Sequence, residues 1–579
     1  MELRAHLEAQ IAQELQQKYS FMMSDIVRMV ETGQSEEAAD YLLFFSSPRE
    51  FPAQSRQLRR LLSDRIAEGA SDLQKNCISF LTHLTLDLSS MLAKWNLQNR
   101  DLHGDRVLTD AEIRDEITAN LRLLTDWEAL FPVAARELLA GWRDAAKARF
   151  IAEKAAQPEV GAEKLVSGAV CAYVHNMAQA FRQSNLRRIA EMRVAGLNGT
   201  ELGNDYAAFL KYTMYLGASF VTTNPVLVDI AWDADPAYWD AVMDKLVTAN
   251  PHANEEELAR LATLEVVLAN MRLLRPIFLL TKGGMGCVSL QVNPKKHGDA
   301  QAMITDATLI YEELRTRLNG GVPNVVFKLP GTLAGLEACR ALTGKGIGVN
   351  ITVNFGLFQQ LRFAEVIREG QAIFATLTEM NGRLAFPVRD ELLGKLPALT
   401  AHGISQADAL EAAAWSGVAV VKKLQKLLTE KGYDLKRIKP LVASLRIYKD
   451  SSCYDRLPSA YPDVTEAVGT SIITVFPDVR HAFDREIEMD LKAEQIHEPV
   501  PTRVLDVLTH SEIFKQAYYV TDTSWVQDEE ERFRPNQILT LEDEAAVAAW
   551  PPVYNTLKQF ADSYDHFVQR LVSRRKGEQ

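Results

Sequence analysis

The chain has 579 residues, more than a single hydrophobic core usually organises, so we expect either two domains or one large domain with an attachment. Lysine and arginine number 64 against 76 aspartates and glutamates, which gives a formal net charge of −12. This balance provides no basic stripe and argues against nucleic acid as a partner. The charged start and the absence of any stretch near the roughly 18 apolar residues of a membrane span predict a cytoplasmic protein without membrane contact.

Residues 1–185 are expected to form an all-helical domain. They are rich in Leu, Ala, Glu, Gln and Arg and have almost no β-branched runs bounded by glycine. Apolar residues recur at helical spacing, as at Leu58 and Leu62, and Thr109 followed by Glu112 resembles a capping box. The pattern does not choose among three roles for these helices: covering the rest of the molecule, binding a partner, or joining copies of the chain into a homo-oligomer.

Residues 186–579 are expected to form a barrel domain. From about residue 190, short β-branched runs alternate with helical patterns, which is typical of repeated βα units around a parallel sheet. Eight such runs predict an α/β fold of the (β/α)8 TIM-barrel type behind the N-terminal all-α domain. The expected strands are 192–197, 218–224, 286–292, 324–330, 346–354, 372–380, 440–447 and 470–476.

The end of the chain is expected to be helical and to pack against the barrel. Its apolar residues form an aromatic stripe at helical spacing, for which packing is a simpler explanation than a ligand role. The members of the stripe are Tyr554, Leu557, Phe560, Tyr564, Phe567 and Leu571.

The fourth expected strand carries a lysine, Lys328, inside an otherwise apolar run. Burying an ammonium group is costly, so the position calls for an explanation. If the side chain points into the mouth of the barrel, desolvation lowers its pKa and leaves a neutral amine that can attack a carbonyl to form a Schiff base. On this strand alone, a lysine that reaches solvent or pairs with a carboxylate is the simpler explanation, and the neighbouring motifs reverse that preference.

Several ordered segments between about residues 190 and 480 resemble the transaldolase family. They are Val-Thr-Thr-Asn-Pro at 221–225, Val-Ser-Leu-Gln-Val at 288–292, the 324–330 strand followed by Thr332, and Val-Asn-Ile-Thr at 349–352. The helix before the third strand and the helix after the fourth are also similar to the family. The resemblance implies class I aldolase-type chemistry on a TIM barrel.

By this resemblance, Lys328 would be the Schiff-base nucleophile, and Thr352 on the fifth strand would help to hold the water that shuttles protons. Thr352 is otherwise an ordinary inward-facing barrel residue. The family's other ligand of that water is a glutamate, and the matching residue here is Gln291. A glutamine orients a water but takes no proton. Fructose-6-phosphate aldolases, a branch of the family, carry glutamine at this position, so the change tilts specificity toward aldol cleavage.

The resemblance also implies contacts to the sugar hydroxyls from Asn224 and Asn350, although each asparagine could instead hydrogen-bond its own backbone. The family's first strand supplies an aspartate that assists carbon–carbon bond cleavage. The run at 193–198 has no aspartate; Asn198 is the nearest candidate, and Asp205 would require a different alignment. An amide cannot act as the base, which puts efficient cleavage in question.

For a substrate phosphate, the seventh strand offers Ser444 and Arg446, in a run similar to the family's Ala-Ser-Phe-Arg, and Arg383 follows the sixth strand. Guanidinium groups suit phosphate because their planar donors bind two oxygens. An arginine is more often a surface ion-pair former, but positions just after strand ends favour a role in the site.

Together these residues predict transfer of a dihydroxyacetone unit from a ketose phosphate, such as fructose 6-phosphate, to an aldose phosphate, a reaction of the pentose phosphate pathway. No metal or organic cofactor is needed. Two alternatives stay open. The enamine is protonated and released, as in a fructose-6-phosphate aldolase, or the barrel has lost turnover and acts as a sugar-phosphate sensor or scaffold. An unusual ketose substrate would be compatible with the same residues.

Overall fold

The computed structural model describes residues 2–90, 108–234, 236–487, 489–526 and 538–576. Within these ranges, parallel strands close into an eight-stranded barrel in which each strand pairs with the next and the last with the first. The strands are β1 (Glu201–Asn204), β2 (Ala218–Thr222), β3 (Val288–Gln291), β4 (Val325–Pro330), β5 (Gly348–Asn354), β6 (Ala375–Met380), β7 (Ile438–Ala443) and β8 (Ile472–Val475). The expected (β/α)8 fold is confirmed.

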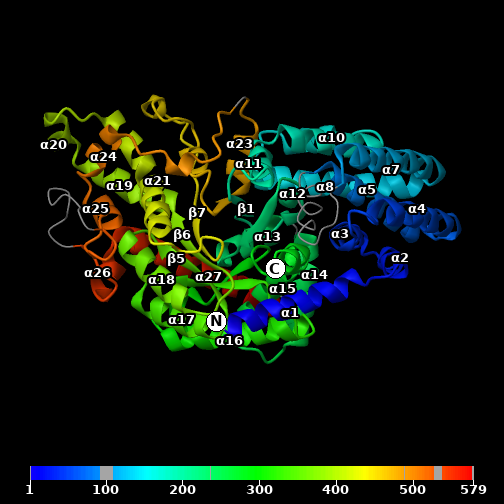
Figure 1. The fold of residues 1–579 in the computed structure, drawn as a ribbon, viewed down its shortest axis with the longest axis horizontal. Coiled ribbons are helices and arrows are strands. Elements are labelled where there is room, and N and C mark those ends of the chain that lie inside the picture. The colour runs from blue at the N-terminus through cyan, green and yellow to red at the C-terminus, as the bar shows by residue number, and fades with distance from the viewer. Residues whose placement is uncertain (1, 91–107, 235, 488, 527–537, 577–579) are drawn as a thin grey trace.

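Helices follow the strands and surround the barrel (Figure 1). They are α12 (Leu210–Tyr215), α13 (Pro225–Ala234), α14 (Pro236–Ala249), α15 (Glu255–Leu280), α16 (Ala300–Arg317), α17 (Leu333–Gly344), α18 (Leu357–Glu369), α19 (Asn381–Gly394), α20 (Leu396–Ala401), α21 (Gln406–Glu430), α22 (Pro462–Thr465) and α23 (Pro477–Asp484). Short 3-10 turns lie at Pro294–Lys296, Ser452–Tyr454 and Gln495–His497.

Seven of the eight expected strands lie where the pattern placed them, but the first expectation was wrong. Residues 192–197 belong to the end of α11 (Asn185–Val194) and the turn that follows it. The strand itself, β1, has the sequence Glu-Leu-Gly-Asn and no β-branched residue, so it gives little sequence signal. A Cβ on Gly203 would lie 2.5 Å from Cγ2 of Thr474 on β8, so this strand needs a glycine where the barrel closes.

The N-terminal helical region, here called the helical front, lies to one side of the barrel (Figure 1). Its helices are α1 (Glu2–Tyr19), α2 (Met23–Glu31), α3 (Ser35–Phe45), α4 (Phe51–Glu68), α5 (Ser71–Ser89), α7 (Asp110–Leu130), α8 (Pro132–Ala152), α9 (Pro158–Leu165), α10 (Val170–Gln183) and α11. Helix α7 starts at the expected capping box, in which Thr109 and Glu112 satisfy each other's backbone N–H groups. Most of these helices share a core of their own.

Helix α1 packs directly on the barrel, as parts of α3 and α11 also do. Leu7, Ile11 and Leu15 are buried in the barrel's core cluster. Glu14 forms an ion pair with Arg275 of α15. Leu7 also lies over Gly346, just before β5 begins. Helix α1 therefore lies near the amino-terminal ends of the strands, away from the end where barrel enzymes place their active sites.

The C-terminal part of the chain covers the outside of the barrel with α24 (Thr502–Leu508), α25 (Glu512–Tyr518), α26 (Glu544–Ala549) and α27 (Pro551–Lys576). The aromatic stripe lies on α27, where Phe560, Phe567 and Leu571 are buried and Tyr554 is exposed. The expected packing role is thus confirmed for these buried members. None of the described helices combines the length and apolarity that crossing a membrane requires.

Candidate active site

A cavity of about 470 Å³ opens at the carboxyl ends of the barrel strands. Strand ends and the loops after them converge at this rim in any (β/α)8 barrel, so side chains far apart in sequence meet there. The polar and charged residues that line it are Lys154, Asp205, Thr222, Asn224, Lys328, Asn350, Thr352, Thr378, Arg383, Ser444, Arg446 and Asp478. Seven of the nine expected site residues are in this set; Gln291 and Asn198 are not.

Lys328 is buried on β4 and lines the cavity. It forms no hydrogen bond or ion pair with the residues that the structure describes. The pKa of its ammonium group is lowered to about 8: burial lowers it most, the charge of Asp205 opposes the shift, and the charge of Arg383 adds to it. An amine with this pKa is substantially neutral close to neutral pH and is therefore a competent nucleophile toward a carbonyl.

Asp205 follows the last residue of β1 and lines the same cavity. Its backbone N–H donates to the carbonyl of Val475 on β8, and its Oδ1 accepts a hydrogen bond from the hydroxyl of Thr222. The carboxylate is thus held at the rim, close enough for its charge to act on Lys328. Its orientation is fixed without neutralisation, which leaves an oxygen able to take a proton.

The suggestion of Asn198 as the strand-one residue is corrected by this geometry. Asn198 lies before β1 and lines a separate cavity with Glu201 and Lys439 near the amino-terminal ends of the strands. The expectation failed because it took the end of α11 for the first strand. Moving the strand to Glu201–Asn204 places Asp205, the alternative considered from the sequence, at the strand's carboxyl end.

Thr352 and Gln291 lie on the strands on either side of Lys328. Thr352 is buried on β5, lines the cavity and has its hydroxyl 3.5 Å from the sulfur of Met380. Gln291 pairs with Lys328 in the β3–β4 register, but its side chain lines a neighbouring cavity. Its Oε1 is buried and has no hydrogen-bond partner among the described residues. Thr352 is therefore the better placed of the two to hold a water inside the main cavity.

The two asparagines of the cavity are held in different ways. Asn224 caps α13: its Oδ1 accepts from the backbone N–H of Leu227 at 2.9 Å, which leaves its Nδ2 donors available. Asn350 lies deep in the barrel, where its Nδ2 donates to Oγ of Ser289 at 2.8 Å and its Oδ1 accepts from Oγ1 of Thr378 at 2.6 Å. Asn350 thus cross-links three strands and lies level with Lys328 in the β4–β5 register.

Arg383 and Arg446 form the cationic side of the cavity. Arg383 lies in the first turn of α19, and burial together with the charge of Arg446 lowers its pKa to about 10. Neither guanidinium forms an ion pair with a carboxylate in the part of the chain that the structure describes. Ser444, between the two, adopts a left-handed φ of 60°. Two uncompensated guanidiniums beside a serine are suited to bind a phosphate.

Gly382 allows these two arginines to approach each other. Its backbone N–H donates to the carbonyl of Ser444 at 3.0 Å. A Cβ on Gly382 would lie 2.5 Å from that carbonyl oxygen and 2.6 Å from Cγ of Arg446. Helix α19 and the end of β7 can therefore meet this closely only at a residue without a side chain.

We predict that Gly382→Ala separates Arg383 from Arg446 and raises KM for a phosphorylated substrate by about tenfold, while kcat changes little because Lys328 is untouched. Initial-rate kinetics would show this split. The matched control is Gly394→Ala, at the end of the same helix, where an added Cβ meets nothing within 4 Å. Equal KM values in Gly382→Ala and the control would contradict the assignment of Arg383 and Arg446 to the phosphate.

The sequence patterns missed two charged residues of the cavity, Lys154 and Asp478. Lys154 follows α8 of the helical front, and its Nζ lies 2.7 Å from Oδ2 of Asp478 in the first turn of α23. Residues separated by more than 300 positions thus share one wall. No motif marks Lys154; the only local clue is that a lysine, rather than a glycine, follows the end of a helix.

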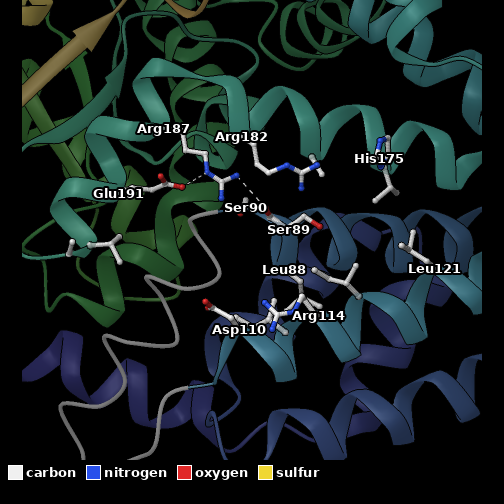
Figure 2. A pocket seen from close by; sticks show the side chains of 16 residues that line it. Leu88, Ser89, Ser90, Asp110, Arg114, Leu121, His175, Arg182, Arg187 and Glu191 are labelled. Atoms are coloured by element: carbon white, nitrogen blue, oxygen red, sulfur yellow. Dashed lines mark hydrogen bonds and ion pairs between the residues drawn. The ribbon is translucent and has the colours of Figure 1, made fainter. Parts of the chain in front are cut away.

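A larger cavity of about 800 Å³ lies within the helical front, between α5, α7, α10 and α11 (Figure 2). Arg187 donates to Glu191 at 2.8 Å and to the carbonyl of Ser89 at 3.3 Å across its upper wall. His175 and Arg182 also line it. No lysine is among the described residues that line this cavity, so it has no amine for imine formation.

A parallel barrel with a buried lysine of lowered pKa on β4 is the arrangement that an enzyme of the class I aldolase type uses. The family model described as Transaldolase/Fructose-6-phosphate aldolase matches residues 204–521, more than half of the chain. The chain therefore belongs to the transaldolase/fructose-6-phosphate aldolase family. The match includes Asp205 and excludes Asn198.

Individual relatives agree with the family model. Transaldolase 1 of Streptomyces avermitilis is 34% identical over 137 residues, which are 24% of this chain and 34% of that protein. A transaldolase of Neisseria meningitidis is 29% identical over 199 residues, 31% and 53% of the two chains. A transaldolase of an Arthrobacter species is 34% identical over 137 residues, 24% and 34% of the two chains. The chain thus matches between a third and about half the length of these curated relatives.

Proposed function

We propose that the protein transfers a dihydroxyacetone unit from a ketose phosphate to an aldose phosphate through a Schiff base on Lys328, in a cytoplasmic setting. The observation that carries the proposal is a buried lysine, with its pKa lowered to about 8, that shares a cavity with one carboxylate and two uncompensated arginines. These groups supply a nucleophile, a base and a phosphate site, which are the three requirements of the reaction.

In the proposed reaction, the neutral amine of Lys328 attacks the ketose carbonyl, and the resulting carbinolamine loses water to give an iminium ion. Thr352, which lines the cavity beside Lys328, holds the water that relays these protons. Asp205 then takes the proton of the C4 hydroxyl. The C3–C4 bond breaks, and its electron pair moves toward the iminium nitrogen to leave an enamine and an aldose phosphate.

Asn224 and Asn350 are assigned to the sugar hydroxyls, and Ser444, Arg446 and Arg383 to the terminal phosphate. The enamine then attacks the aldehyde of an acceptor aldose phosphate, and hydrolysis of the new iminium frees Lys328. No metal or organic cofactor enters these steps. Protonation of the enamine instead of transfer would give aldol cleavage. Fructose-6-phosphate aldolases, a branch of the family, carry glutamine at the position of Gln291, and this resemblance favours that second outcome.

The test is to trap the imine with borohydride. We expect incubation with fructose 6-phosphate followed by reduction to add one sugar-derived mass to the peptide that contains Lys328. Only the neutral amine attacks. The rate of adduct formation should therefore increase about tenfold for each unit by which the pH rises toward 8, and it should level off above pH 8. A midpoint near 10.5, the value of an ordinary lysine, would contradict the site described here, and no adduct with any ketose phosphate would favour a sensor or scaffold.

A further inference from the structure

The role of the helical front is the question that the proposed function leaves open. Most of its helices pack among themselves. The end of α8 is different, because it reaches the carboxyl-terminal rim of the barrel and places Lys154 on the wall of the cavity. Among the described residues that line this cavity, Lys154 is the one that comes from the helical front.

The end of α8 is fixed to the barrel by a buried ionic network. Glu153 accepts hydrogen bonds from Arg149 of the same helix and from Arg480 of α23, both at 2.8 Å. Nδ1 of His481 lies 3.2 Å from the other oxygen of Glu153. Burial alone would raise the pKa of Glu153, but the charges of Arg149 and Arg480 and the hydrogen bond from His481 outweigh burial and hold it below its usual value. Such a network places the backbone of the next residue firmly.

The same network reaches the catalytic side of the barrel. Nη1 of Arg480 lies 3.4 Å from Oδ1 of Asn204, the residue before Asp205. The guanidinium of Arg149 also stacks on the ring of Tyr212 in α12, 3.8 Å from its centroid. The end of α8 is thus tied to the segments after both β1 and β8. Its position relative to the cavity is therefore set by the barrel itself.

Lys154 is held in a backbone conformation that its own side chain does not favour. Its φ is 52°, in the left-handed region, and its N–H bonds to the carbonyl of Ile151 at 2.9 Å. Glycine is the residue usually found there, because a side chain is disfavoured in this region. The side chain is largely exposed and pairs with Asp478. Exposed ion pairs contribute little to stability, so a substrate anion can take the ammonium from Asp478 at small cost.

The net positive charge of the cavity suits an anion that carries more charge than one carboxylate. Four cationic side chains line it, Lys154, Lys328, Arg383 and Arg446, against the carboxylates of Asp205 and Asp478. Two positive charges are in excess when Lys328 is protonated. A phosphate monoester carries close to two negative charges at neutral pH and has three terminal oxygens, which two arginines do not exhaust.

We propose that Lys154, supplied by the helical front, is a third cationic ligand of the substrate phosphate and makes the enzyme selective for phosphorylated over unphosphorylated sugars. This inference rests on the proposed function. The helical front then completes the substrate site from the β8 side of the rim, and Arg446 lines the same cavity from the β7 side. The barrel alone would lack this selectivity.

The experiment compares full-length Lys154→Gln with Lys147→Gln, which removes the same charge from a half-exposed lysine of α8 that pairs with Glu159. Binding of inorganic phosphate, measured by titration calorimetry, needs no Schiff base. We expect Lys154→Gln to weaken it about tenfold and Lys147→Gln to leave it unchanged. Equal phosphate affinity in the two variants would overturn the inference.

Borohydride trapping gives the second comparison. Lys154→Gln should raise the half-saturating concentration of fructose 6-phosphate about tenfold and leave that of unphosphorylated fructose unchanged, which also shows that the variant is folded. A parallel loss with both sugars would mean that Lys154 acts on the fold and not on the phosphate. The wild-type protein could bind phosphate through Lys154 and yet form no adduct with either sugar. That result would support the inference about Lys154 and contradict the proposed transfer reaction.

Discussion

Lys328→Met is expected to abolish turnover, with a loss of at least about 10⁴-fold in kcat, and to abolish the borohydride adduct. Methionine has nearly the length of lysine but no amine, so the imine cannot form. Steady-state kinetics and intact-mass spectrometry would measure the two losses. The control is Lys345→Met, which changes an exposed lysine at the opposite end of the barrel and should leave both unaffected.

The same substitution should make the protein more stable, which separates a chemical loss from an unfolding one. Burial lowers the pKa of Lys328 from 10.5 to about 8, so the folded state disfavours the charged amine by about 3 kcal/mol. This cost is fully present below pH 8, where the amine is protonated in both the folded and the unfolded chain, and it disappears as the pH rises beyond 10.5. Chemical unfolding should therefore show a gain for Lys328→Met at pH 7 that shrinks at pH 10. A less stable variant at pH 7 would mean that Lys328 is not the buried, unpaired cation described here.

Asp205→Asn is expected to lower kcat by about 10² to 10⁴-fold, because an amide cannot accept the C4 hydroxyl proton. The asparagine oxygen can still accept the hydrogen bond from Thr222, so the fold should be kept. Imine formation should survive, and its pH midpoint should fall below 8, because the carboxylate of Asp205 raises the pKa of Lys328. Trapping and turnover measured on one preparation would show this separation.

The control for Asp205 is Asp565→Asn, which removes a carboxylate from a half-exposed pair with Lys295 and should leave kcat unchanged. A parallel loss of adduct and turnover in Asp205→Asn would assign Asp205 to the support of Lys328 rather than to bond cleavage. Full turnover in Asp205→Asn would mean that another residue removes the C4 hydroxyl proton.

The sequence was sufficient for the barrel and for its reactive amine. Seven strands are β-branched runs long enough to be seen locally, and their buried positions match those runs. A lysine within the apolar run of β4 is conspicuous because an ammonium group is costly to bury. The first strand was not predicted because β1 has no β-branched side chain, and because its pairing with β8 joins segments about 270 residues apart. Only closure of the barrel shows that Asp205, and not Asn198, stands at its carboxyl end.

The charges of the site depended still more on tertiary structure. Arg383 and Arg446 could be named from strand-end positions, but their approach depends on Gly382 fitting against the carbonyl of Ser444. No motif in the sequence marked Lys154, because the contact of Glu153 with Arg480 is what brings it to the cavity. By itself, then, the sequence determined the fold class and pointed to the proposed nucleophile and to most of the cavity residues assigned to the substrate, because these are local patterns of burial and residue type. Which distant carboxylates and cations join that lysine was decided by long-range packing, since no local pattern records the partner that a buried charge will meet.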